Sequence, residues 1–231
     1  MKTIQELVPL IQEWAKERKI YEELTPFDQL LKTHEEVGEL IKACYDNDKP
    51  AIQDAIGDTM ICLINYCYFI ELDVIKKIKR AVELSLPELD IITRVIEVYK
   101  SLGRLISINM RNGDKKLSEP SEIRVFSIAH SLNEIALLEN TTLEECLNIA
   151  YNEIKNRTGK MINGKFMKDK TIEKIKESVQ KEIAEKQKEG KTLMEILEES
   201  RSLTITNPYL YYNSLANSQN ILKTKKRYKK K

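Results

Sequence analysis

Residues 29–65 read QLLKTHEEVGELIKACYDNDKPAIQDAIGDTMICLIN, and this stretch decides both the fold and the candidate site. It holds two acidic clusters, HEEVGEL at 34–40 and DAIGD at 54–58, joined by the polar link DNDKP at 46–50. Such a link between two segments with apolar residues at helical spacing predicts a pair of adjacent helices. The sequence therefore predicts that the two acidic clusters face each other across a helix pair.

The carboxylates of these clusters fall along single lines of the predicted helices. At about 100° per residue, Glu36 and Glu39 lie at the margin of the packing face of the first helix. Asp54, Asp58 and Asn65 fall at i, i+4 and i+11 on the second helix, again on one line. Both sets of oxygen-bearing side chains are thus expected beside the core and away from the fully solvated side.

The second predicted helix is apolar almost all round after Asp58, as the run MICLINYCYFI at 60–70 shows. A helix of this kind must be buried, and the run is too short for a bilayer, which needs about 20 residues. Buried charge without a partner is costly. We therefore expect the aspartates on this helix to have a function, and metal binding is the leading hypothesis.

The whole chain has the composition of an all-α protein. It contains 231 residues with 42% hydrophobic content, 7 Gly and 6 Pro, and its apolar residues recur at helical spacing. No convincing strand alternation is present. Helices are predicted over 3–22 with Thr3 as N-cap, from Pro26 to Tyr45 after the cap Thr25, and from Pro50 to Ile70.

The remaining two thirds of the chain are also expected to be helical, with an architectural role up to residue 140. Residues 73–140 predict two or three helices, with His130 as a structural histidine. The run TTLEE at 141–145 is a capping-box helix start, with a threonine cap and a glutamate three positions later. Residues 171–203 predict highly charged helices interrupted at Gly190, whose thin apolar seam suits packing on a neighbour.

The charge and the cysteine content of the chain limit the classes of function that it can have. The formal net charge is +2, and without the seven Lys and Arg of residues 223–231 it becomes −5. This mildly acidic body fits a metal-binding protein better than a nucleic-acid reader, although the basic tail alone could touch polyanions. Four cysteines in apolar helical contexts are interpreted as reduced thiols of a cytoplasmic protein without a signal peptide or membrane span: Cys44, Cys62, Cys67 and Cys146.

The side chains of the acidic clusters are suited to a hard cation. Carboxylate oxygens and water are the ligands of Mg²⁺ or Mn²⁺, and the absence of a nearby His or Cys pair argues against zinc and di-iron centres. Magnesium in turn implies a phosphate-bearing substrate. The alternative interpretation is a solvated helix face, because Glu-x-x-Glu is common there.

Several spaced motifs resemble the MazG-like all-α nucleoside triphosphate pyrophosphohydrolases of bacteria and phages. They are WAxxR at 14–18, QxxKxxEExGEL at 29–40, GD at 57–58 followed by Asn65, LEECL at 143–147, and NEIKxRxGKMxNGxF at 152–166. The resemblance covers about residues 3–72 and 141–168. It implies a MazG-like helical bundle over 1–168, with 73–140 as inserted helices and 169–231 as a charged helical extension with a basic tail.

This resemblance implies Mg²⁺-dependent cleavage of a nucleoside triphosphate between its α- and β-phosphates. Glu36, Glu39 and Asp58 match metal ligands of the family. The family usually has a glutamate at the position of Ala55, and Asp54, one turn before Asp58, is expected to take its place.

Other positions match residues that would contact the substrate. Glu35 is the candidate for orienting the attacking water, and Lys32, Lys155 and Arg157 would neutralise phosphate oxygens, although the last two also suit a helix C-terminus. Two further substrate-binding candidates each have a structural alternative. Asn65 either binds metal-bound water or sugar, or satisfies a buried polar contact. Trp14 either stacks on a nucleobase, or belongs to the core or to a subunit interface.

Two function classes remain open at this stage. The first is an active pyrophosphohydrolase. The second is a catalytically weak nucleotide-binding or interaction protein that keeps the fold, and the reasons to consider it are Ala55 at the family's glutamate position and the added segments. A homodimer or homotetramer is expected because the apolar faces of the predicted helices are wide.

Overall fold

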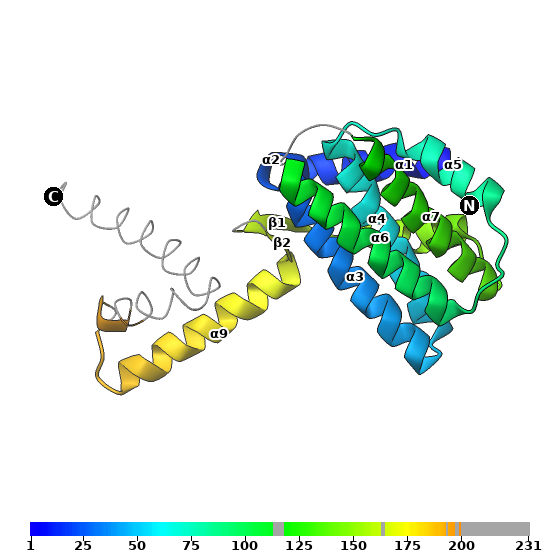
Figure 1. Cartoon of the computed structure of the whole chain (residues 1–231). Coiled ribbons are helices and arrows are strands. Elements are labelled where there is room, and N and C mark those ends of the chain that lie inside the picture. Colours follow the sequence, from blue (N-terminus) through cyan, green and yellow to red (C-terminus); the bar gives the residue numbers. More distant parts are fainter. Residues whose placement is uncertain (113–117, 163–164, 193, 197–198, 200–231) are drawn as a thin grey trace. The chain divides into compact units, whose positions relative to one another are not determined.

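The computed structural model describes residues 1–112, 118–162, 165–192, 194–196 and 199, and helices dominate this part of the chain (Figure 1). The expected all-α class is therefore confirmed. The elements are α1 (Ile4–Glu17), α2 (Ile20–Glu23), α3 (Pro26–Asp46), α4 (Lys49–Phe69), α5 (Val74–Leu84), α6 (Ile91–Asn112), α7 (Glu119–Leu138), α8 (Leu143–Ile154), β1 (Gly159–Ile162), β2 (Lys165–Lys168) and α9 (Asp169–Lys188).

The chain divides into two compact units, Met1–Arg157 and Thr158–Lys231. The first unit contains α1 to α8 and one hydrophobic core to which each of these helices except α2 contributes buried residues. The expected boundary was residue 168, so the division falls before the β-hairpin instead of after it.

The first predicted helix is interrupted, and the expectation of one helix over 3–22 was wrong. Thr3 caps α1 with Glu6 in a capping box, as the sequence indicated. The helix ends at Arg18, because Lys19 adopts a left-handed conformation with φ of 58° before the short α2 begins. Left-handed backbone is costly for a residue with a side chain.

The helix pair α3 and α4 matches its sequence signals closely. Thr25 caps α3 and accepts from the Asp28 N–H, with Pro26 in the first helical position. Asn47 then takes the left-handed conformation (φ 51°) that reverses the chain, and Asp48 caps α4. From Thr59 to Cys67 every residue of α4 is buried, which confirms the prediction of a buried helix.

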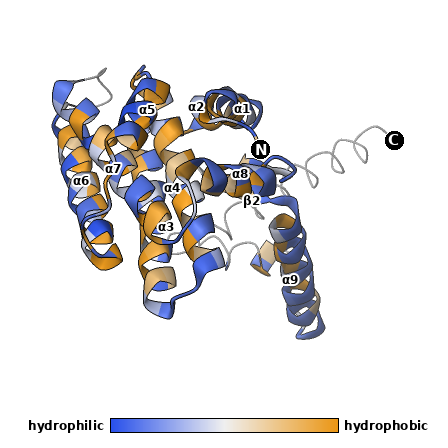
Figure 2. Ribbon diagram, turned by 90° about the vertical axis from the view of Figure 1, so that its right-hand side faces the viewer, coloured by the Kyte–Doolittle hydropathy of each residue, from blue (hydrophilic) through white to orange (hydrophobic). Residues whose placement is uncertain are grey.

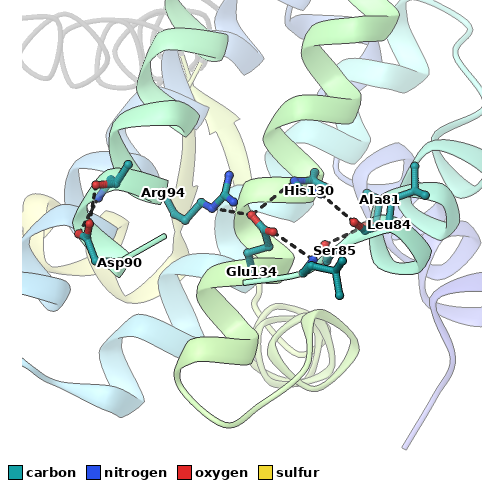
Figure 3. Close-up of polar contacts among 9 residues, drawn as sticks. Ala81, Leu84, Ser85, Asp90, Arg94, His130 and Glu134 are labelled. Atoms are coloured by element: carbon teal, nitrogen blue, oxygen red, sulfur yellow. Dashed lines mark hydrogen bonds and ion pairs between the residues drawn. The ribbon is translucent and has the colours of Figure 1, made fainter. Parts of the chain in front are cut away.

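The described residues between 73 and 140 form three helices, α5 to α7, which a buried charge cluster joins (Figure 3). The carboxylate of Glu134 on α7 is 1% exposed and accepts from the Leu86 N–H of the α5–α6 link at 3.2 Å. Arg94 Nε lies 2.5 Å from Glu134 Oε2 without the geometry of an aligned hydrogen bond, so the contact is an ion pair. His130 Nδ1 lies 3.5 Å from the same oxygen, in agreement with its predicted structural role.

The second unit begins with an antiparallel β-hairpin that the sequence did not predict. Gly159 pairs with Lys168 and Ile162 with Lys165. A Cβ at Gly159 would lie 2.3 Å from the Met167 carbonyl oxygen, so glycine is required for this close approach. The hairpin and α9 share a small apolar cluster of Ile162, Met167 and Ile172, with Ile175 packed against it.

Helix α9 is coloured almost entirely as hydrophilic (Figure 2). It ends at Lys188 with Glu189 as its C-cap, and Gly190 follows with φ of 87° at the predicted interruption. The predicted basic tail and most of the second charged segment lie outside the described residues. Within the described part of the chain, no helix has the length and apolar character needed to cross a membrane.

Candidate metal centre

The α3 side of the site consists of a buried carboxylate covered by a lysine. Glu36 is 5% exposed, and Lys32 Nζ lies 2.6 Å from Glu36 Oε1 and 3.0 Å from Glu35 Oε2. Burial alone lowers the pKa of Lys32, but its bonds to the two glutamates outweigh burial and raise it. Lys32 therefore stays charged and neutralises Glu36.

The next turn of α3 adds a more exposed carboxylate. Burial of its carboxyl group and the negative charge of Glu36 raise the pKa of Glu39, while Lys32 acts in the opposite direction. Glu36 and Glu39 are thus electrostatically coupled along one margin of the helix. This is the arrangement expected from their i, i+3 spacing.

The α4 side of the site holds two half-buried aspartates, Asp54 and Asp58. Burial, followed by the charges of Glu36 and Asp54, raises the pKa of Asp58 from 3.8 to about 7. Burial and the charge of Glu153 raise the pKa of Asp54 as well. Among the described residues, Asp58 has no ion pair of its own. Within the described part of the chain, the carboxylates at the facing margins of α3 and α4 therefore outnumber the cations beside them, Lys32 and Arg157.

The residues that follow α8 bring an arginine to these aspartates. The charge of Arg157 lowers the pKa of both Asp54 and Asp58, against the other effects. Arg157 also forms an ion pair with Glu153 one turn earlier. Two groups about a hundred residues apart in sequence are thus close enough to affect each other.

Helix α1 holds the end of α8 in this position. Trp14 Nε1 donates to the Ile154 carbonyl at 2.9 Å, and Arg18 Nη2 donates to the Arg157 carbonyl at 2.6 Å. On the other side, α4 and α8 approach closely at Gly57, where a Cβ would lie 2.4 Å from the Cys146 carbonyl oxygen. The glycine between the two aspartates therefore allows α8 to lie against α4.

Three candidate substrate-binding residues lie outside this charge cluster. Lys155 is exposed and donates to Asn152 Oδ1 at 2.7 Å. Asn65 is 2% exposed and accepts from the Tyr21 hydroxyl at 2.7 Å, about 10 Å along α4 from Asp58. Trp14 is half-buried, and the Arg18 guanidinium lies 4.8 Å from its ring centroid. Asn65 thus makes the buried polar contact that was the structural alternative for it.

The donor set suits a hard cation, but the described side chains do not converge on one point. No group of three or more His, Cys, Asp or Glu side chains placed to hold a metal ion occurs among the described residues. Glu36 contacts Lys32, and Glu153 contacts Arg157. A metal ion at this site would therefore have to compete with an internal lysine and arginine.

Two neighbours of the cluster were not singled out from the sequence as site residues. The negative charge of Glu153 on α8 raises the pKa of both aspartates. In the sequence, Glu153 could have been found from its position four residues before Arg157, because opposite charges at this helical spacing favour an ion pair. Cys62 lies one turn after Asp58 and is 7% exposed, and burial followed by the charge of Glu36 raises the pKa of its thiol.

Comparison with known proteins gives one partial match. The chain is 36% identical over 64 residues to an "Uncharacterized 18.2 kDa protein in rep-hol intergenic region" of Haemophilus phage HP1 (strain HP1c1). The match covers 28% of this chain and 39% of the phage protein. No family model matches the chain, and no solved structure matches significantly.

Proposed function

We propose that this protein is a Mg²⁺-dependent nucleoside triphosphate pyrophosphohydrolase that releases a nucleoside monophosphate and pyrophosphate. The observation that carries the proposal is the gathering of buried Glu36 on α3 with half-buried Asp54 and Asp58 on α4, where burial and the neighbouring charges raise the pKa of Asp58. Perturbed carboxylates of this kind concentrate at functional sites. A divalent cation is the species that would relieve the charge, and Mn²⁺ has the same ligand preference.

In this function, Glu36, Glu39, Asp54 and Asp58 would hold the metal. Once bound, the metal supplies charge neutralisation and polarisation at the phosphoryl group. Lys32 Nζ, which lies 2.6 Å from Glu36 Oε1, would pair with a phosphate oxygen where Glu36 holds the metal. Arg157 neutralises further phosphate charge, and Glu35 accepts a hydrogen bond from the attacking water.

Burial supports Asp54 as the replacement for the glutamate that the family has at position 55. Ala55 is 5% exposed and belongs to the hydrophobic core, whereas Asp54 is half-buried and coupled to Asp58. Asp54 is therefore the fourth ligand in this proposal. Its neighbour Glu153 lies on a different helix and adds negative charge at the same point.

The test is an assay of the purified full chain with nucleoside and deoxynucleoside triphosphates and Mg²⁺, with separation of monophosphate, diphosphate and pyrophosphate products. We expect monophosphate and pyrophosphate in equal amounts, and loss of both on EDTA treatment. Asp58→Asn should lower turnover at least about 100-fold, while the exposed Glu83→Gln should not change it. Equal turnover by Asp58→Asn would contradict the assigned site.

A second function, nucleotide binding without turnover, is favoured by one specific observation. The carboxylates of the described residues do not form a ready metal-binding group, and Ala55 stands where the family that the chain resembles usually has a glutamate, so that only the shorter Asp54 could take its place. Calorimetry with a non-hydrolysable triphosphate separates the two functions. Mg²⁺-dependent binding together with absence of product from every triphosphate would support this second function.

A further inference from the structure

Arg18, the C-cap residue of α1, has no part in the proposed function, although its side chain is only 14% exposed. Its Nη1 donates to the Trp14 carbonyl at 3.2 Å, and its Nη2 donates to the Arg157 carbonyl at 2.6 Å. The guanidinium also lies over the Trp14 ring, 4.8 Å from the ring centroid. One side chain therefore joins the end of α1 to the segment that follows α8.

These bonds are made at the C-terminal ends of the two helices. The last four carbonyl groups of a helix have no partner within it, and their partial negative charge attracts cations. Arg18 supplies a donor to the Trp14 carbonyl in the last turn of α1. Trp14 Nε1 in turn donates to the Ile154 carbonyl, the last of α8, at 2.9 Å. Trp14 and Arg18, which we call the α1 clamp, thus bind both helix ends.

The backbone of Arg157 is held by the α1 clamp. Helix α8 ends at Ile154 and β1 begins at Gly159, so Arg157 belongs to neither element. Its N–H donates to the Ile154 carbonyl at 2.9 Å, and its own carbonyl accepts from Arg18. Both groups that bind the Arg157 backbone, the Ile154 carbonyl and the Arg18 guanidinium, are therefore fixed by α1.

The side chain of Arg157 is the cation that the end of α8 brings to the candidate site. It forms an ion pair with Glu153, and its charge acts on the two aspartates of α4. Elsewhere along α8, the close approach at Gly57 fixes the distance between α8 and α4. Electrostatic stabilisation depends on where the charge is held, and a displacement of about 1 Å can lower a rate about 100-fold. The position of the Arg157 backbone is therefore expected to matter for phosphate chemistry.

We propose that Arg18 and Trp14 are positioning residues of the nucleotide site, which act by holding Arg157 beside the carboxylates of α4. This proposal rests on the proposed function, because Arg157 neutralises phosphate charge there. It gives Trp14 a role other than stacking on a nucleobase, since the indole N–H binds the Ile154 carbonyl and Arg18 covers a face of the ring. Neither residue of the α1 clamp touches the substrate in this role.

Two conservative substitutions separate the α1 clamp from simpler roles of its residues. The planar guanidinium of Arg18 reaches carbonyl groups of two segments at once, whereas a lysine ammonium is a compact charge on a flexible stem. Arg18→Lys therefore keeps the positive charge and loses the bridge. Trp14→Phe keeps an aromatic ring for stacking and loses the indole N–H. Charge alone predicts an active Arg18→Lys variant, and nucleobase stacking alone predicts an active Trp14→Phe variant.

The test is a double-mutant cycle between the α1 clamp and Arg157 in the full chain. Its readout is kcat/KM with Mg²⁺ and the triphosphate that the wild type cleaves fastest. Arg18→Lys and Trp14→Phe should each lower kcat/KM at least about 10-fold and keep the helical circular dichroism. In the Arg157→Leu background the same substitutions should change kcat/KM less than about 2-fold, because the group that they position has been removed.

Asn148→Ala is the matched control, because Asn148 ties α8 to the chain just before α1. The Lys2 N–H donates to Asn148 Oδ1 at 3.0 Å, and Asn148 Nδ2 donates to the Lys2 carbonyl at 2.7 Å. The variant thus loses bonds between the same segments at a distance from Arg157. Its kcat/KM should stay within about 2-fold of the wild type.

Equal losses with and without Arg157 would show that the α1 clamp only supports the fold, and would overturn the proposal. Full activity of both clamp variants would also overturn it. A wild type that cleaves no triphosphate contradicts the proposed pyrophosphohydrolase separately. The same cycle is then measured by calorimetry, as the dissociation constant of α,β-methylene-ATP with Mg²⁺. Losses of affinity that require Arg157 support the proposal there, and losses independent of Arg157, or absence of binding, overturn it.

Discussion

Replacement of Asp58 by asparagine is expected to stabilise the metal-free protein while it removes activity. The carboxylate of Asp58 is unfavourable in the folded state, because burial and the charges of Glu36 and Asp54 raise its pKa from 3.8 to about 7. Each pKa unit corresponds to about 1.4 kcal/mol, so the shift gives an upper limit of about 4 kcal/mol. Partial exposure of the side chain reduces the expected effect to about 2 kcal/mol.

The pH dependence has a definite sign. Between about pH 4 and pH 7 the folded state binds a proton at Asp58 that the unfolded state has released, so the free energy of unfolding falls as the pH rises. Asparagine has no proton to lose. The Asp58→Asn variant should therefore match the wild type near pH 4 and exceed it by about 2 kcal/mol at pH 8.

The assay is urea unfolding, followed by circular dichroism at fixed protein concentration in EDTA, at pH 4.5 and pH 8. Mg²⁺ at ten times its dissociation constant should then stabilise the wild type by about 1.4 kcal/mol at pH 8, but not Asp58→Asn. Glu83→Gln is the control and should follow the wild type throughout. A variant that is less stable than the wild type at pH 8, or equally stabilised at both pH values, would refute the reasoning.

Three further predictions test packing, buried charge and phosphate recognition. In urea titrations, Gly57→Ala should lower the free energy of unfolding by about 1–3 kcal/mol, because the added Cβ would overlap α8. Gly38→Ala has free space around the added Cβ and should raise the free energy of unfolding by up to about 1 kcal/mol. Glu134→Ala should cost about 3–5 kcal/mol in the same measurement, because it leaves a mostly buried arginine without its counter-charge; a loss below 1 kcal/mol would contradict a buried ion pair. Arg157→Leu should reduce nucleotide turnover far more than Lys155→Leu, since Lys155 lies outside the cluster and bonds to a neighbouring side chain; equal losses would contradict this distinction.

Helix starts were predicted well because their signals are local. Thr3, Thr25 and Thr142 each act as N-caps with a partner three residues later, and each forms the capping box that this spacing favours. The burial of α4 also followed directly from its composition. These features depend on neighbours within one turn, which a single sequence displays.

Features that depend on distant contacts were not visible in the sequence. The break at Lys19 has no glycine or proline to mark it. The hairpin strands have four residues each, too few to show alternation, and Gly159 is explained only by the carbonyl of Met167 opposite it. Glu153 joined the site because α1 and α4 fix the end of α8, and such tertiary placement leaves no periodic pattern.

The bonds between α1 and α8 have a consequence for synthesis of the protein on the ribosome. The Lys2 and Ile4 amides donate to Asn148 and Glu144, and Trp14 donates to the Ile154 carbonyl, across about 140 residues of chain. Helix α1 is synthesised before α8 and can make these bonds only after α8 has also left the ribosome. Contacts of such long sequence separation form late and slowly, so the acidic cluster can be completed only after translation has passed Arg157.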